Sequence, residues 1–430
     1  MDRLQQWQTQ WKDLPQPRKI KALRFVVFGC YAFALFFLVI YAFGGTKKRV
    51  SEPARVVVFM ETTPGALMAL RYLAKRADVS IAMIVLTVNA WNANLNAAYD
   101  NTAAFLAMLK GEAVLKYDVP VYYGSSVAQV NARFNDEIMF PVNGGEAPNT
   151  TACTYRRVIG PGLSLAADSL FGASELLDGV PLFVPGSGHG DGDDDGDSLL
   201  GQYEFFNTPL SRYLSDHAAA FLVLGPATDA ASFLQQQHPK IRAKVNHIFL
   251  AGGALKVKGD TCLVYPPNWR SEQHTFFDPL AANYIVSGAH GRPVDLLPLD
   301  ALPQWPTSLY AALITSRVDP STTSSSLVDA SARVVARAFI GYSKQFGIDK
   351  LMPVEVLAAP YFADAVTRGG ATVAEMSLLV ANGFTMSTDG LIGAPSSVQP
   401  QKKSFRVKVV LHLNERMFWS RLEAVDRLRI

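Results

Sequence analysis

The sequence of 430 residues has little cysteine and little excess of charge. Its three cysteines are Cys30, Cys153 and Cys262, too few for the disulfide framework that stabilises small secreted domains. The 40 basic and 37 acidic residues leave a formal net charge of +3. Because nucleic-acid-binding proteins carry a strongly basic patch or stripe, this balance argues against nucleic acid as a partner.

One stretch near the start of the main domain organises the rest of the chain. A β-branched run that begins at Arg55 and is apolar over 56–60 breaks at Pro64-Gly65 and restarts with helical spacing, which predicts a strand, a tight loop and a helix. In an open α/β sheet such a loop lies at the carboxyl edge, where ligands bind. The loop and the start of the helix carry one carboxylate, Glu61, beside Thr63, Leu67 and Met68. This set has too few oxygen donors for a hard cation.

The stretch resembles the opening of the inosine-uridine nucleoside hydrolase family, whose signature D-T-D-P-G-x-D-D-A lies on the same strand, loop and helix. Pro64, Gly65 and Ala69 match it closely. Two later segments, 220–231 and 246–254, are similar to the family's L-G-P-L-T-N-L-A and I-V-V-M-G-G-A. The resemblance runs from about residue 55 to the C-terminus. It implies an α/β fold with an open, mostly parallel sheet flanked by helices.

The acidic residues that the family uses are mostly replaced. By register, Glu61 and Thr63 take the places of the first two Asp residues, and Leu67 and Met68 take those of the Asp pair. Met352 stands for the Asp of the family's H-D-P-x-A. The resemblance implies that these carboxylates hold a calcium ion, which needs six to eight oxygens, so the replacements should remove it. We interpret the five positions as a degenerate former metal site, and we expect no cofactor.

The family's ligand pocket is also kept only in part. Asn92 fits the Asn of T-V-x-G-N, although Trp91 replaces the Gly of that motif. Glu272 survives from A-E-F-N, whose Asn becomes His274, and Leu351 replaces the His that assists the departing base. A general base is one interpretation of His274, and an exposed loop histidine is the commoner one. We expect a weak polar pocket from the remaining polar side chains, namely Glu61, Asn92, Glu272 and Asp300.

Two stretches without a family counterpart, about 128–161 and 185–204, are interpreted as insertions in a domain that spans 55–430. The second contains Asp191, Asp193 and Asp195, which copy the first half of an EF-hand loop. Gln202 stands where that loop needs a bidentate Glu, so a solvated acidic loop is the preferred interpretation. Calcium binding at this loop stays an open alternative.

Residues 25–46 carry no charge and are dense in Phe, Leu, Val and Tyr. A helix rises ~1.5 Å per residue, so this segment is long enough to cross a hydrocarbon core of ~30 Å. A cleaved signal peptide is the alternative, but the apolar run exceeds the usual ~7–15 residues and no clear A-x-A site follows. We therefore expect a tail over 1–24, a single transmembrane helix over 25–46, and a membrane as a partner.

Three functions from different classes remain open. The acidic residues and the His of the family are replaced, while the strands and helices that carry them keep their regular patterns. This combination favours a non-catalytic accessory or scaffold subunit whose partners are the other protein subunits of a membrane complex. The alternatives are a metal-free nucleoside or sugar-binding module and a divergent N-glycosidic hydrolase. Repurposed enzyme folds with one membrane helix occur in mitochondrial respiratory and ATP synthase complexes. By that analogy we expect the mitochondrial inner membrane as the location.

The first testable prediction concerns residues 25–46, which we expect to form an uncleaved membrane helix because of their length and bordering charges. The native protein should then stay in the pellet after carbonate extraction, and N-terminal sequencing should start ahead of residue 25. A soluble protein that begins near Gly44 would contradict the anchor.

Overall fold

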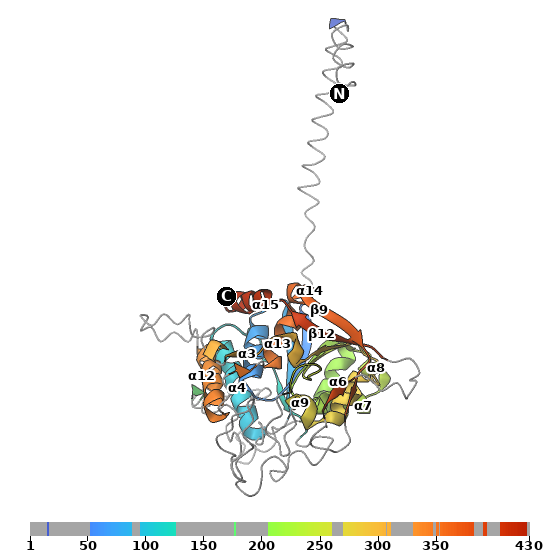
Figure 1. Ribbon diagram of the computed structural model, residues 1–430. Helices are drawn as coiled ribbons and strands as arrows, with labels where there is room; N and C mark the ends of the chain where they lie inside the picture. The colour runs from blue at the N-terminus through green and yellow to red at the C-terminus, as the bar shows by residue number, and fades with distance from the viewer. Residues whose placement is uncertain are drawn as a thin grey trace. The chain divides into compact units, whose positions relative to one another are not determined.

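The computed structural model describes residues 15–16, 52–87, 95–125, 176–177, 205–259, 270–306, 308–310, 330–346, 350–351, 353–381, 390–393 and 405–427. The chain divides into two units, Met1–Glu52 and Pro53–Ile430. The fold that follows is that of the second unit (Figure 1).

A central sheet organises this unit. Its strands are β1 Ala54–Met60, β2 Val79–Leu86, β3 Val121–Tyr123, β4 Ala219–Leu224, β5 Val245–Ala251, β6 Val294–Leu297, β9 Ala371–Met376 and β12 Val407–Leu413. They lie in the order β3-β2-β1-β4-β5-β6-β12-β9. Adjacent strands are parallel except for β9, which is antiparallel to β12. The prediction of an open, mostly parallel sheet is confirmed.

The two faces of the sheet contribute to separate cores. On β1, Val56, Val58 and Met60 enter one core while Val57 and Phe59 enter the other. This alternation is the period of two that any strand imposes on its side chains. Because both faces are covered, β1 and β4 read as nearly continuous apolar runs, as expected for inner strands of a parallel sheet.

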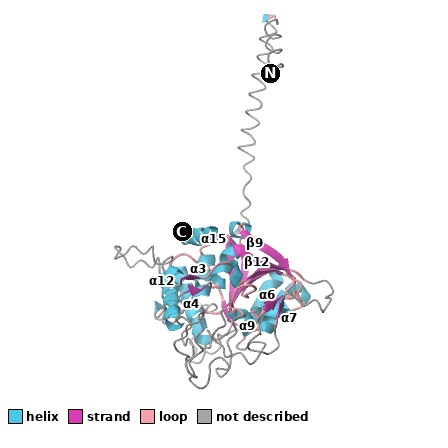
Figure 2. Ribbon diagram, in the orientation of Figure 1, coloured by secondary structure: helices cyan, strands magenta, loops and turns pink. Residues whose placement is uncertain are grey.

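Helices cover both faces of the sheet (Figures 1 and 2). The first core includes residues of α3 Pro64–Ala74, α4 Leu95–Gly111, α12 Ala330–Phe346, α13 Val354–Ala363 and α15 Glu415–Arg427. The second includes residues of α6 Asn207–Asp216, α7 Thr228–Gln236 and α10 Pro279–Val286. Shorter elements complete the described unit: α8 Pro239–Arg242, α9 Gln273–Phe277, α14 Ala365–Gly369, η3 Leu299–Ala301, and the strand pairs β7 Trp305–Pro306 with β8 Lys350–Leu351 and β10 Leu379–Val380 with β11 Ile392–Gly393.

The strand, loop and helix predicted at the start of the domain are present as β1, its loop and α3. The helix begins at Pro64, slightly earlier than the apolar spacing alone suggests. Thr63 is its N-cap, and its side chain accepts a hydrogen bond from the N–H of Ala66 at 3.2 Å. Proline suits the first helical position because its missing N–H would have no helical partner there. The cap therefore fixes the loop that leads out of β1.

Within the described residues, no helix is both long and apolar enough to cross a membrane. The predicted membrane segment 25–46 and the insertions at 128–161 and 185–204 lie outside those residues. The tail over 1–24 lies outside them too, apart from residues 15–16.

The second prediction tests the core beneath the site. Leu222 on β4 is fully buried in the first core, so Leu222→Ala should lower the free energy of unfolding by ~2–5 kcal/mol. The matched control is Val373→Ala on β9, because Val373 is 45% exposed. A surface change of this kind should stay within about 0.5 kcal/mol. Chemical denaturation measures both, and equal effects would contradict the placement of β4 at the centre.

Candidate functional site

The loop after β1 places Glu61 and Thr63 at the carboxyl edge of the sheet. The loop is tied to α4, because the Thr62 hydroxyl donates to the carbonyl of Ala98 at 3.1 Å. Glu61 is 1% exposed, so its carboxylate lies inside the protein. In this position it faces side chains from two other elements, α9 and α13.

Helix α9 supplies Glu272 and His274. Glu272 is the N-cap of the helix, and its carboxylate accepts hydrogen bonds from the N–H groups of His274 at 2.9 Å and Thr275 at 3.2 Å. It also accepts one from the N–H of Gly253 at 2.8 Å. Gly252 and Gly253 both have positive φ, and a Cβ on Gly252 would lie 2.7 Å from Glu272 Oε2. Gly252 is therefore needed to let Glu272 approach the backbone, whereas a Cβ on Gly253 would meet Ile392 instead.

Helix α13 supplies Glu355 in its first turn, where the helix dipole favours a carboxylate. Glu355 Oε1 accepts a hydrogen bond from the Thr63 hydroxyl at 3.0 Å. Gly65 makes this approach possible, because a Cβ there would lie 2.8 Å from Pro353 Cβ and 2.9 Å from Glu355 Oε2. The Pro64-Gly65 pair thus brings the start of α3 against the start of α13.

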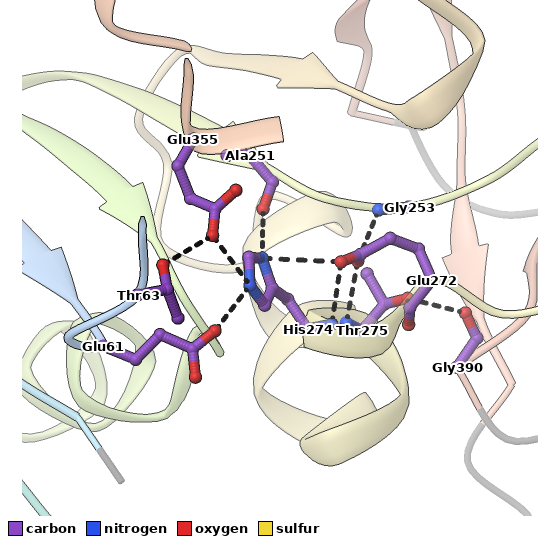
Figure 3. Close-up of polar contacts among 9 residues, drawn as sticks. All are labelled: Glu61, Thr63, Ala251, Gly253, Glu272, His274, Thr275, Glu355 and Gly390. Atoms are coloured by element: carbon purple, nitrogen blue, oxygen red, sulfur yellow. Dashed lines mark hydrogen bonds and ion pairs between the residues drawn. The ribbon is translucent and has the colours of Figure 1, made fainter. Parts of the chain in front are cut away.

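His274 lies in the middle of these carboxylates (Figure 3). Its Nε2 atom is 3.0 Å from Glu61 Oε1 and 4.0 Å from Glu355 Oε1. Its Nδ1 atom is 3.2 Å from the carbonyl oxygen of Ala251 and 3.5 Å from Glu272 Oε1. We call Glu61, Glu272, His274 and Glu355 the buried cluster. It joins the carboxyl ends of β1 and β5 to the first turns of α9 and α13.

Burial and mutual charge shift the protonation of the cluster. Burial raises the pKa of Glu61 to about 7, and it also raises the pKa of Glu355. Burial alone would lower the pKa of His274, but the carboxylates of Glu272, Glu61 and Glu355 raise it well above its usual value. The cluster is therefore a set of buried acids around one basic ring, and it holds protons at neutral pH.

The donor set does not fit calcium. Calcium takes six to eight oxygen ligands at about 2.3–2.6 Å. Around Glu61 the described residues offer a second carboxylate on Glu355, the hydroxyl of Thr63 and the ring nitrogen of His274. Leu67 and Met68, at the positions of the family's Asp pair, are buried in the first core. A hard cation would therefore meet a nitrogen and apolar carbon where it needs oxygen.

The structure brings together part of the predicted site. Glu61, Thr63, Leu67, Met68, Glu272 and His274 lie within the described residues and are all buried. Met352 and Asn92 lie outside those residues, and of Leu351 only the backbone is described. The location of those three side chains in a cleft stays a prediction.

One expectation was wrong, and a second stays untested. His274 is not an exposed loop histidine: it is 4% exposed in α9, because the N-cap of Glu272 turns the chain into a helix that points the ring inward. That Asp300 shares a polar pocket with Glu61 stays a prediction. The Asp300 carboxylate accepts hydrogen bonds from the N–H groups of Leu255 and Lys256, both at 2.8 Å. Asp300 therefore holds the loop after β5.

Glu355 is the member of the cluster that the sequence did not reveal. The register to the H-D-P-x-A motif drew attention to Leu351 and Met352, whereas the acid follows Pro353 by two residues. The available signal was an acidic residue in the first turn of a predicted helix, a pattern so common in ordinary helices that it indicates no site. Thr63 and Glu355 are 292 residues apart in the sequence, so their contact can be identified only from the folded structure.

The sequence profile of the inosine-uridine preferring nucleoside hydrolases matches residues 58–420, and the chain belongs to this family. The matched part includes every member of the buried cluster. No match was found among curated proteins. The family assignment made from the motifs is thus confirmed.

Solved nucleoside hydrolases share the fold at low sequence identity. The plant nucleoside hydrolase PpNRh1 is 16% identical with a TM-score of 0.58, and 88% of this chain aligns with 100% of that one. An inosine-guanosine nucleoside hydrolase is 15% identical with a TM-score of 0.61, again over 88% and 100% of the two chains. A purine-preferring ribonucleoside hydrolase from Gardnerella vaginalis is 15% identical with a TM-score of 0.57, over 87% and 100%. These similarities establish the fold.

The third prediction is that the purified chain holds no stoichiometric calcium in the cleft, because the donor set there is too poor in oxygen. Elemental analysis and a calcium titration by calorimetry measure this. Asp195→Ala serves as the control, since it removes calcium that binds at the acidic loop rather than at Glu61. Calcium that is bound tightly in Asp195→Ala and lost in Glu61→Gln would contradict the interpretation.

Proposed function

We propose that the protein is a non-catalytic, membrane-anchored accessory or scaffold subunit of a larger membrane complex. One observation carries the non-catalytic part: the ring of His274 lies between the carboxylates of Glu61 and Glu355, at 3.0 and 4.0 Å. The polar groups at the carboxyl edge are therefore engaged with one another.

The buried cluster is a poor hydrolytic site. Cleavage of an N-glycosidic bond needs an activated water, stabilisation of charge at the ribose and a proton for the departing base. Glu61, His274 and Glu355 are 1%, 4% and 6% exposed, so a nucleoside would have to displace packed side chains to reach them. Glu272 is held by three backbone N–H groups and would have to give them up to contact a sugar.

Apolar packing supports the same proposal. Leu67 and Met68 lie in the first core with the side chains of α13 and α4. Burial of apolar surface contributes ~25 cal/mol per Å² to the free energy of folding. Two apolar side chains in place of two acids would therefore stabilise the folded domain. A fold that retains its sheet and helices while its cleft becomes core is suited to a structural role.

The anchor and the insertions are the parts that we assign to partners. The family's catalytic fold accounts for neither residues 25–46 nor the segments 128–161 and 185–204, whereas a subunit needs a membrane attachment and a surface of its own. By analogy with other repurposed enzyme folds, we place the complex in the mitochondrial inner membrane, as a respiratory or ATP synthase assembly. Its partners are the membrane and other protein subunits.

A divergent N-glycosidic hydrolase is the second candidate. Two buried acids beside a histidine favour it, since a carboxyl with a pKa of about 7, as Glu61 has, suits general acid or base catalysis. A metal-free nucleoside-binding module would use the same residues without turnover. Both alternatives require that a nucleoside reaches the buried cluster.

The fourth prediction is that changes to the buried cluster leave the assembly intact while loss of the anchor or of an insertion does not. Glu61→Gln and Glu272→Gln should co-purify with the same subunits as the wild type in mild detergent. Deletion of residues 1–46, or replacement of 128–161 by a short Gly/Ser linker, should release the domain from them. Quantitative mass spectrometry of the co-purified subunits measures the difference, and circular dichroism confirms that each variant folds.

The same preparations decide between the candidates. The wild type should show no release of base from inosine or uridine. Turnover that disappears with Glu61→Gln would establish the hydrolase instead, and saturable nucleoside binding without turnover would establish the binding module. A truncated chain that still co-purifies with every subunit would contradict the scaffold.

A further inference from the structure

The protonation of the His274 ring decides what can lie between His274, Glu61 and Glu355. The Nδ1 atom of the ring lies 3.2 Å from the carbonyl oxygen of Ala251, which accepts and cannot donate, so Nδ1 carries a proton. In the neutral ring Nε2 then presents a lone pair toward Glu61 Oε1 and Glu355 Oε1. Such a group of acceptors is stable only with a cation between them, either a proton or a metal ion.

The spacing of the three groups suits a small transition-metal ion. Glu61, His274 and Glu355 each offer a ligand atom, and these atoms lie within 4.8 Å of one another. Zinc binds nitrogen at about 2.0–2.1 Å and carboxylate oxygen at about 2.0–2.2 Å, so ligand atoms around it lie roughly 3.3–3.5 Å apart in a tetrahedral site. The observed separations of 3.0 Å and 4.0 Å from His274 Nε2 bracket that value.

The surrounding contacts have the form that supports metal ligands. A ligating histidine usually donates its other N–H to a carbonyl or carboxylate, and Ala251 provides that carbonyl. A ligating carboxylate is usually held by a hydrogen bond of its own, and the Thr63 hydroxyl gives one to Glu355 at 3.0 Å. These contacts fix the ring and the carboxylate before any ion binds.

The charge balance of the buried cluster also favours a bound metal ion. Three carboxylates and one imidazole are packed into one buried region, and unpaired buried charge is strongly unfavourable. The three N–H groups already stabilise Glu272. A divalent ion on Glu61, Glu355 and a neutral His274 would leave no net charge on those groups. Glu61 Oε2 is buried and has no hydrogen-bond partner among the described residues, so the Glu61 carboxylate is not fully satisfied by the protein alone.

We propose that Glu61, His274 and Glu355 bind a divalent transition-metal ion of the zinc class, which links the loop after β1 to α9 and α13. The donor set of one imidazole and two carboxylates suits such ions, whereas calcium prefers oxygen alone. Of the positions aligned with the family's acids, the set uses only that of Glu61. The proposal does not depend on a scaffold role, because a structural ion would stabilise the domain whatever its partners.

The test begins with the full-length wild-type chain in mild detergent. Protein from cells grown with zinc should contain one zinc ion per chain by plasma mass spectrometry. After removal of metal with a chelator, added ZnCl₂ should raise Tm, and CaCl₂ at the same concentration should not. Cobalt(II) in place of zinc should give the visible absorption of a low-symmetry nitrogen and oxygen site. A chain that takes up neither ion would overturn the proposal.

Variants assign the ion to these residues. Glu61→Gln, His274→Gln and Glu355→Gln should each weaken zinc binding by at least ~10-fold, since even outer contacts of metal sites are worth ~10–100-fold. The matched control is His247→Gln, because His247 Nε2 also faces a carboxylate, Asp295 Oδ1 at 2.9 Å, but lies outside the cluster. His247→Gln should bind zinc like the wild type.

One variant acts without removing a ligand. Thr63→Val loses the hydroxyl that holds Glu355 and should weaken zinc binding, whereas Thr63→Ser keeps that hydroxyl and should restore it. This pair gives an answer even if a ligand variant fails to fold. Zinc retained at full affinity in folded His274→Gln, or equally in Thr63→Val and Thr63→Ser, would place the ion elsewhere and overturn the proposal.

Discussion

The charge balance of the buried cluster is the constraint on which the carboxyl edge of this sheet depends. Three carboxylates from the β1 loop, α9 and α13 surround a single imidazole, with His274 Nε2 3.0 Å from Glu61 Oε1. Repulsion among buried acids would open the edge unless a cation or shared protons offset it. Compensation of these charges therefore stabilises the packing of α9 and α13 against the loop after β1.

The backbone around the cluster shows how the fold permits this close packing of carboxylates and imidazole. The positive φ angles of Gly252 and Gly253 let the chain after β5 pass close to Glu272, and Gly65 lets α3 approach Glu355. These close approaches bring the loop after β1 together with side chains of α9 and α13. The packing of the described residues thus requires the glycines at positions 65 and 252.

The sequence was a good guide to the fold and a partial guide to the site. Strand β1 and the strong motifs at 220–231 and 246–254 place the parallel sheet, because their patterns are local and repeat with the period of a strand. The residues around His274 indicate an exposed loop, because nothing local shows that Glu272 caps a helix and turns the ring inward. Glu355 was missed because its role comes from contacts with Thr63 and His274, far away in sequence. Local pattern thus identifies elements, whereas a site made by several elements needs their packing.

A buried histidine among acids also decides how the charge of the site is balanced. Leu67 and Met68 make the neighbouring wall apolar, so the buried acids must be neutralised or paired by groups of the cluster itself. A histidine at position 274 supplies the missing positive charge from within the chain, and with its ring neutral it supplies a nitrogen ligand for a softer ion. Both outcomes keep α9 and α13 docked on β1. The apolar side chains of Leu67 and Met68 and the imidazole of His274 therefore belong to one arrangement, in which the buried charge is balanced within the cluster.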